Sequence, residues 1–196
     1  MALRISLALS ALCLVVVVGL SNVQAHKFSA SVGQETFPSP PSDQTLIYLA
    51  GEKNALTPLP FETGVTPLRI EMVATSDKRS YVEIKGERAM TVITNDEPRF
   101  YLFLPDKPDA KPPFVVRLTE KGHARRVTAM AQKGYKGYAI AAEDIIKPHY
   151  RILSHEGGMQ FMEIRMREPL VQGEYAIIGT DLQHIATFRV AAALNR

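Results

Sequence analysis

The sequence contains one cysteine and no tryptophan, and these absences narrow what the protein can be. Cys13 lies inside the first apolar segment, so we expect no disulfide and no catalytic or metal-binding thiolate in the rest of the chain. With no Trp and only seven Tyr, a flat aromatic face for gripping crystalline polysaccharide is not evident. The fold must therefore be stabilised by apolar burial.

A strong excess of charge is also missing. Lys and Arg number 23 against 20 Asp and Glu, which gives a net charge of +3 at pH 7. Nucleic-acid-binding proteins usually gather basic residues on one face. The densest basic stretch, residues 120–138, is interpreted as a solvated hairpin, and we predict no nucleic-acid partner.

Motifs of common catalytic sites are absent from the sequence, including Gly-x-Gly-x-x-Gly, Gly-x-x-x-x-Gly-Lys and Gly-x-Ser-x-Gly. The stretch "HEGGM" begins like a zinc-binding His-Glu-x-x-His helix but has Met159 where the second histidine is required. Ser154, His155 and Glu156 are adjacent in sequence, whereas a catalytic triad is assembled from separated segments. These observations favour a protein that is not an enzyme.

Residues 1–25 have the pattern of a secretory signal peptide. Arg4 precedes an apolar run over residues 5–20, and Val23 and Ala25 occupy the −3 and −1 positions of a cleavage site. A membrane span needs about 20 apolar residues, so we favour cleavage over an uncleaved anchor. We expect a bacterial periplasmic or secreted protein, with no membrane association after cleavage.

The rest of the chain divides into a short arm and one β domain. Residues 26–44 are rich in Ser and Pro and are interpreted as an N-terminal arm. Residues 45–196 alternate short runs of Val, Ile, Tyr, Phe and Thr with turns that contain Gly, Pro, Asp and Asn. This pattern predicts an all-β fold, a single antiparallel β-sandwich (immunoglobulin-like or similar) with about ten short strands.

Alternation within the strands predicts which side chains face the core. In "SYVEIK", Val82 and Ile84 are expected to face inward and their neighbours outward. Residues 99–104, "RFYLFL", are apolar on both faces, so this strand is expected at the centre of a sheet. We expect at most one short helix, near residues 139–147.

Two proline-rich stretches separate the strands. Residues 56–62 and 65–71 share a Thr-Pro-Leu motif and are interpreted as adjacent extended segments at an edge or crossover. Residues 104–114, "LPDKPDAKPPF", fit either a linker between two domains or a long loop between two strands, and we favour the loop.

The five histidines all fall in or beside predicted turns, which favours surface positions: His26, His123, His149, His155 and His184. A continuous strand would separate His149 from His155 by about 20 Å, so this pair cannot share a metal ion.

His26 is the exception, because cleavage after Ala25 would make it the first residue. An N-terminal amine, its own ring nitrogen and a second histidine form a three-nitrogen set that suits Cu(II). The stretch "EPLVQGEYAIIGTDLQHIATFRV" resembles the end of the periplasmic copper-resistance C-type carriers, which are exported β-sandwich proteins. The resemblance implies His26, Asp181 and His184 as copper ligands, although this chain has Asp-Leu-Gln-His where the family has Asp-Gly-His.

The sequence therefore leaves two functions open. The favoured one is an exported, non-catalytic binding or structural module that contacts an unknown protein or glycan partner and needs no cofactor. The alternative is a periplasmic copper-binding protein that uses its N-terminal histidine.

Overall fold

The computed structural model describes residues 36–72, 78–131, 138–179, 182 and 184–192. Over these residues the chain is nearly all β, with two short 3₁₀ turns, η1 (Glu52–Asn54) and η2 (Ala142–Asp144). The predicted all-β, sandwich-like fold is confirmed, whereas the immunoglobulin-like assignment stays a prediction.

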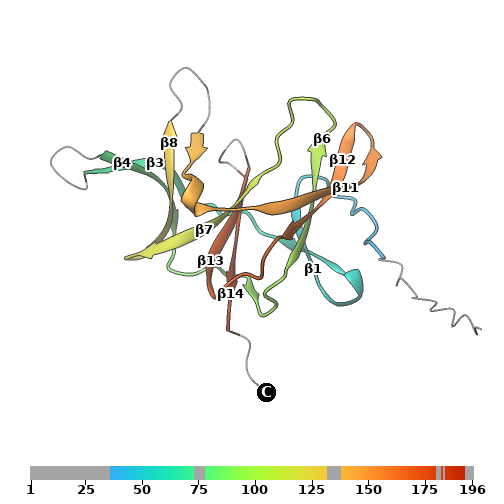
Figure 1. The fold of residues 1–196 in the computed structure, drawn as a ribbon, viewed down its shortest axis with the longest axis horizontal. Coiled ribbons are helices and arrows are strands. Elements are labelled where there is room, and N and C mark those ends of the chain that lie inside the picture. The colour runs from blue at the N-terminus through green and yellow to red at the C-terminus, as the bar shows by residue number, and fades with distance from the viewer. Residues whose placement is uncertain (1–35, 73–77, 132–137, 180–181, 183, 193–196) are drawn as a thin grey trace, which may run out of the picture. The chain divides into compact units, whose positions relative to one another are not determined.

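The strands form two sheets (Figure 1). The first has five strands, in the order β11 (Pro148–Glu156), β12 (Met159–Met166), β6 (Arg99–Pro105), β1 (Ile47–Ala50) and β2 (Leu56–Leu59). All its pairs are antiparallel. The central position predicted for "RFYLFL" is confirmed, because β6 lies between β12 and β1.

The second sheet has nine strands. Its main path runs β3 (Val65–Met72), β4 (Lys78–Lys85), β8 (Ala124–Ala131), β7 (Phe114–Lys121), β13 (Gly173–Ile178), β14 (Ile185–Val190) and β5 (Val92–Ile93). Off this path, β9 (Tyr138–Ile140) pairs with β8, and β10 (Ile145–Ile146) pairs with β7. The β14–β5 pair is parallel, and the other pairs of the main path are antiparallel.

A core of apolar side chains lies between the two sheets. Phe100 and Leu102 of β6 and Ile164 of β12 pack there against Ile177 of β13 and Phe188 of β14. The opposite face of β7 and β13 carries a second cluster, to which β4 and β8 also contribute. The strands β7, β13 and β14 are thus covered by apolar residues on both faces, as expected of central strands.

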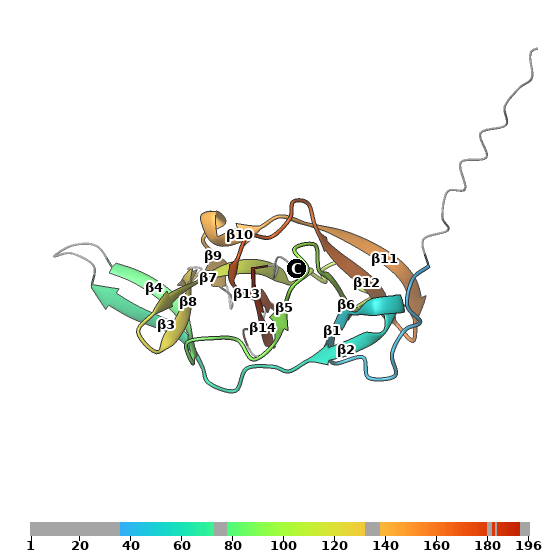
Figure 2. The same cartoon turned by 90° about the horizontal axis from the view of Figure 1, so that it is seen from below.

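The chain between β2 and β3 crosses from one sheet to the other (Figure 2). Phe61 forms a β-bridge with Ala186 of β14, and the Glu62 N–H donates to the Ile185 carbonyl at 2.8 Å. Two residues later, the Gly64 carbonyl accepts from the Lys85 N–H of β4 at 2.9 Å. This crossing segment, residues 60–64, is therefore hydrogen-bonded to both β14 and β4 of the nine-stranded sheet. The stretch 56–71 is expected at an edge or crossover, and the chain there does cross between the sheets.

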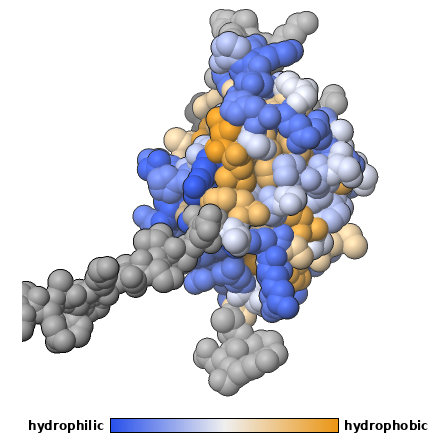
Figure 3. Space-filling model, turned by 90° about the vertical axis from the view of Figure 1, so that its right-hand side faces the viewer, coloured by the Kyte–Doolittle hydropathy of each residue, from blue (hydrophilic) through white to orange (hydrophobic). Residues whose placement is uncertain are grey.

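The outer face of the five-stranded sheet carries a third, aromatic cluster. Tyr48, Tyr101, Phe103 and Phe161 are buried there, and the ring centroids of Phe103 and Phe161 lie 5.0 Å apart. The ring centroid of Phe37 lies 4.4 Å from the guanidinium carbon of Arg151. Seen from this side of the molecule, apolar residues reach the surface between hydrophilic ones (Figure 3).

The stretch near residues 139–147, where at most one short helix is expected, forms β9, η2 and β10 and contains no α-helix. Pairing with β8 and β7 satisfies its backbone, and the Asp144 carboxylate accepts from the Thr128 N–H at 3.0 Å. The β7–β8 turn forms the expected hairpin, but Arg125 and Arg126 are buried rather than solvated. Val82 and Ile84 face the core as predicted. Their neighbour Glu83, which is expected to face outward, is buried because its carboxylate pairs with Arg126.

Candidate ligand-binding cavity

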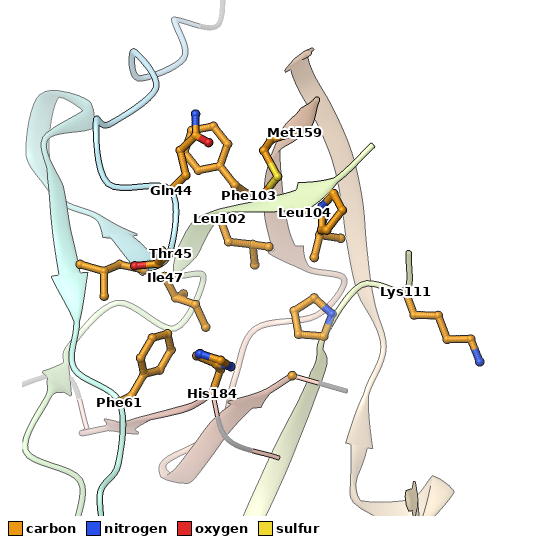
Figure 4. Close-up of a pocket in the computed structure, with 14 residues that line it drawn as sticks. Gln44, Thr45, Ile47, Phe61, Leu102, Phe103, Leu104, Lys111, Met159 and His184 are labelled. Atoms are coloured by element: carbon orange, nitrogen blue, oxygen red, sulfur yellow. The ribbon is translucent and has the colours of Figure 1, made fainter. Parts of the chain in front are cut away.

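A cavity of about 410 Å³ opens where β6 leaves the five-stranded sheet (Figure 4). The five-stranded sheet, the turn before β1, the β6–β7 loop, the crossing segment and the β13–β14 turn contribute to its wall. Most of the lining residues are apolar: Leu46, Ile47, Phe61, Leu102, Phe103, Leu104, Pro105, Pro113 and Met159. The other described lining residues are Gln44, Thr45, Lys111, Gly179 and His184. Ligand pockets in proteins commonly have about this volume and this balance of apolar and polar residues.

The β6–β7 loop is anchored at its first residue. The Asp106 N–H donates to the Gly158 carbonyl at 2.8 Å. Its carboxylate accepts from the Gln160 amide at 2.7 Å and lies 2.9 Å from Nδ1 of His155. The hydrogen bonds from Gln160 and His155 lower the pKa of Asp106. The turn between β11 and β12 thus fixes where the chain leaves β6.

The same loop is also anchored at its far end. The Tyr150 hydroxyl of β11 donates to the Pro113 carbonyl at 2.7 Å, and burial raises the pKa of Tyr150 to about 12. Between the two anchors, the Ala110 N–H donates to the Lys107 carbonyl at 3.1 Å. Lys111 follows this turn directly, so the mouth of the cavity is edged by a loop with fixed ends.

A tight turn before β1 forms another part of the wall. The Asp43 carboxylate accepts from both the N–H and the hydroxyl of Thr45, at 2.9 and 2.7 Å. These hydrogen bonds lower the pKa of Asp43. The Tyr48 hydroxyl donates to the Asp43 carbonyl at 2.8 Å, which ties the turn to the first strand. Asp and Thr at this spacing form such turns readily.

His184 is the polar side chain that points into the hollow in Figure 4. It stands just before β14, where the Gly179 N–H donates to its carbonyl at 3.1 Å and closes the β13–β14 turn. Its ring meets Phe61 edge to face, with centroids 5.1 Å apart and an angle of 78° between the planes. The backbone bridge between Phe61 and Ala186 holds the two rings in register.

The described lining is mostly apolar, and its polar groups include one amine and one imidazole. It also includes the Thr45 hydroxyl, which is used within the turn before β1, where it donates to the Asp43 carboxylate at 2.7 Å. An apolar ligand would gain free energy from burial against Leu102, Leu104 and Met159.

A buried charge network lies on the other side of the crossing segment, and we call its four members the Arg125 network: Arg125, Glu62, Glu174 and Thr187. Arg125 is 1% exposed. Its guanidinium donates to the Thr187 hydroxyl at 2.7 Å, to the Glu62 carboxylate at 2.9 Å and to the Gly86 carbonyl at 3.0 Å. The Thr187 hydroxyl also bonds to the Glu62 carboxylate.

Glu174 completes this network. One carboxylate oxygen accepts from the Ala89 N–H at 2.8 Å and lies 3.7 Å from the guanidinium of Arg125. The other oxygen is buried and has no hydrogen-bond partner among the described residues. Burial raises the pKa of Glu174, against the opposing effects of the Ala89 hydrogen bond and the Arg125 charge.

The structure brings one of the three predicted copper ligands into the cavity. His184 lines it, whereas His26 and Asp181 lie outside the described residues. Among the residues that are described, no three His, Asp or Glu side chains are grouped so that they could hold a metal ion. The copper alternative therefore stays a prediction.

The other described histidines lie elsewhere. His149 and His155 stand near opposite ends of β11, as expected from their spacing. The ring of His123 is exposed and contacts the Glu87 carboxylate at 2.5 Å. Sequence reasoning missed the cavity residues Phe61 and Lys111. The available signal was the long proline-rich stretch 104–114, which the structure shows to be a loop joining the two sheets.

Comparisons with known protein families, with curated proteins and with solved structures gave no match to this chain. In the part of the chain that the structure describes, there is no helix with the length and apolar character required to cross a membrane.

Proposed function

We propose that this chain is a non-catalytic binding module that holds a ligand with an apolar body in the cavity between its sheets. The cavity carries the proposal, because its volume of about 410 Å³ and its mostly apolar lining suit a small ligand. The pattern of residues 1–25 supports a periplasmic or secreted site of action.

The chemistry of the lining narrows the partner expected from the sequence. A glycan presents many hydroxyl groups, and each would lose hydrogen bonds to water against Leu102, Leu104 and Ile47. A ligand with a hydrocarbon body loses none and gains from the burial of its surface. We therefore favour an apolar small molecule over a glycan as the cavity's ligand.

The test is titration with N-phenyl-1-naphthylamine, a neutral apolar fluorophore, of the protein purified after export. We expect saturable binding with one site per chain. Leu104→Trp should weaken it at least about tenfold, because the partly buried Leu104 lines the cavity and a larger ring fills it. Val171→Trp is the matched control, since Val171 is 59% exposed and lies outside the described lining.

Equal binding by the wild type and Leu104→Trp would place the probe elsewhere and contradict the proposal. A complete lack of saturable binding would contradict it as well. Circular dichroism of both variants checks that each retains the β structure of the wild type.

A further inference from the structure

The charges around the mouth of the cavity indicate which kind of ligand head group it accepts. Lys111 is the charged side chain in the described lining. Figure 4 shows its backbone at the edge of the cavity and its side chain extending away from the hollow. The lysine is exposed, so its ammonium is hydrated and can reposition over a head group at the mouth.

Acidic residues flank three of the lining segments, but each has a local partner. Asp43, beside Gln44, accepts two hydrogen bonds from Thr45. Asp106, beside Pro105, is bound by Gln160 and His155. Glu62, beside Phe61, is paired with Arg125. Among the described lining residues, Lys111 is therefore the charge that can meet a head group, which favours an anion over a cation, although Asp109, two residues earlier on the loop, is exposed too.

We propose that the cavity binds an aliphatic carboxylate, with its chain among Leu102, Leu104 and Met159 and its carboxylate at the mouth beside Lys111. This inference rests on the proposed function and adds the ligand's chemical class. The carboxylate stays in contact with water in this arrangement, so it avoids the large cost of burying a charge. The chain supplies most of the affinity, and Lys111 supplies the preference for an anion.

The experiment compares decanoate with 1-decanol as competitors for the bound naphthylamine at low ionic strength. The two share a chain length and differ in the charge of the head group. We expect decanoate to bind up to about fivefold more tightly, the upper range for an exposed ion pair. Decanoate should also bind more tightly than octanoate, by about fourfold for each added methylene.

Lys111→Gln should reduce the preference for decanoate over decanol to less than about twofold, because it removes the charge and keeps most of the stem. Lys107→Gln is the matched control, since Lys107 lies on the same loop but outside the described lining, and it should keep the wild-type preference. Raising the salt concentration should weaken the preference in the wild type.

The outcomes separate this inference from the proposed function. If decanol binds the wild type as tightly as decanoate, or if Lys111→Gln keeps the full preference, the carboxylate inference is wrong and the apolar cavity still stands. If neither competitor displaces a probe that Leu104→Trp excludes, the cavity does not take aliphatic chains and the inference is again wrong. If the probe itself does not bind, the proposed function fails first.

Discussion

The cavity and the Arg125 network border the same two pieces of chain but differ in how their polar groups are satisfied. On the crossing segment, Phe61 lines the cavity and Glu62 belongs to the network. At β14, His184 lines the cavity and Thr187 belongs to the network. The arginine of the network is satisfied within the protein, since it donates to three oxygen acceptors at 3.0 Å or less, whereas one buried oxygen of Glu174 has no hydrogen-bond partner among the described residues.

The difference explains why one region is structural and the other is the candidate site. A buried guanidinium must find acceptors from the protein itself, so the network holds β8, β13, β14 and the crossing segment in one arrangement. The apolar side chains that line the cavity need no hydrogen-bond partners, and the cavity volume is available to a ligand.

Arg125→Leu is expected to produce the largest effect, because it removes the guanidinium partner of the partly buried Glu62 and of the buried Glu174. Glu174 is then left with the more distant guanidinium of Arg189, at 4.0 Å. Breaking a buried ion pair from one side typically costs about 3–5 kcal/mol of the free energy of unfolding. Urea denaturation monitored by circular dichroism measures it. The exposed Arg167→Leu is the control and should change stability by less than about 0.5 kcal/mol. An equal loss of unfolding free energy in Arg125→Leu and Arg167→Leu would show that the Arg125 network does not stabilise the fold more than an exposed arginine does.

Tyr101→Phe tests the same principle on the outer face of the five-stranded sheet. Tyr101 lies opposite Glu163 in the β6–β12 register and donates to its carboxylate at 2.9 Å. Burial and then the Glu163 hydrogen bond raise the pKa of Tyr101 to about 12, so it stays a neutral donor. Loss of a hydrogen bond to a charged group is expected to cost about 1.5–3 kcal/mol.

Tyr175→Phe is the matched control for that variant. Its hydroxyl donates to the uncharged Val171 carbonyl at 2.7 Å, so its loss is expected to cost only about 0.5–1.5 kcal/mol. Urea denaturation of both variants at pH 7 gives the comparison. A larger loss in Tyr175→Phe would contradict the role given to Glu163.

Glu174→Gln tests whether the buried Glu174 makes the stability of the Arg125 network depend on pH. Because burial raises the folded-state pKa of Glu174 above its usual value, the folded protein binds this proton more tightly than the unfolded chain. Stability from this group is therefore present at low pH and is lost as the pH rises through the folded-state pKa. Relative to Glu174→Gln, the wild type should lose unfolding free energy as the pH rises above the usual pKa of a glutamate carboxyl.

Urea denaturation of wild type and Glu174→Gln at several pH values measures this trend. Glu168 is exposed and serves as the control. The difference in unfolding free energy between the wild type and Glu168→Gln should not change in this way with pH. A wild type that gains stability relative to Glu174→Gln as the pH rises would mean that attraction to Arg125 outweighs desolvation of Glu174.

Much of the fold could be predicted from the sequence, because it depends on short-range alternation. The two-sided apolar character of β6 and the inward positions of Val82 and Ile84 both follow from period-two patterns. The Arg125 network could not be predicted, since Arg125 lies 63 residues after Glu62 and 49 residues before Glu174. In addition, the sequence "ARRV" is typical of a surface strand. The cavity was equally hidden, because a space between sheets depends on strand order rather than on local sequence.

The His184→Phe variant is expected to change stability the least, and it tests whether His184 belongs to an apolar-ligand site or to a copper site. His184→Phe keeps an aromatic ring beside Phe61, and His184 is exposed, so the unfolding free energy should change by less than about 0.5 kcal/mol. Titration of the exported protein with Cu(II), beside His26→Ala and His184→Phe, gives the second measurement. The apolar-ligand proposal predicts probe binding without metal and similar Cu(II) affinities in all three proteins. Submicromolar Cu(II) binding that both substitutions abolish would instead make His184 a metal ligand, and the polar wall of the cavity would then belong to a copper site.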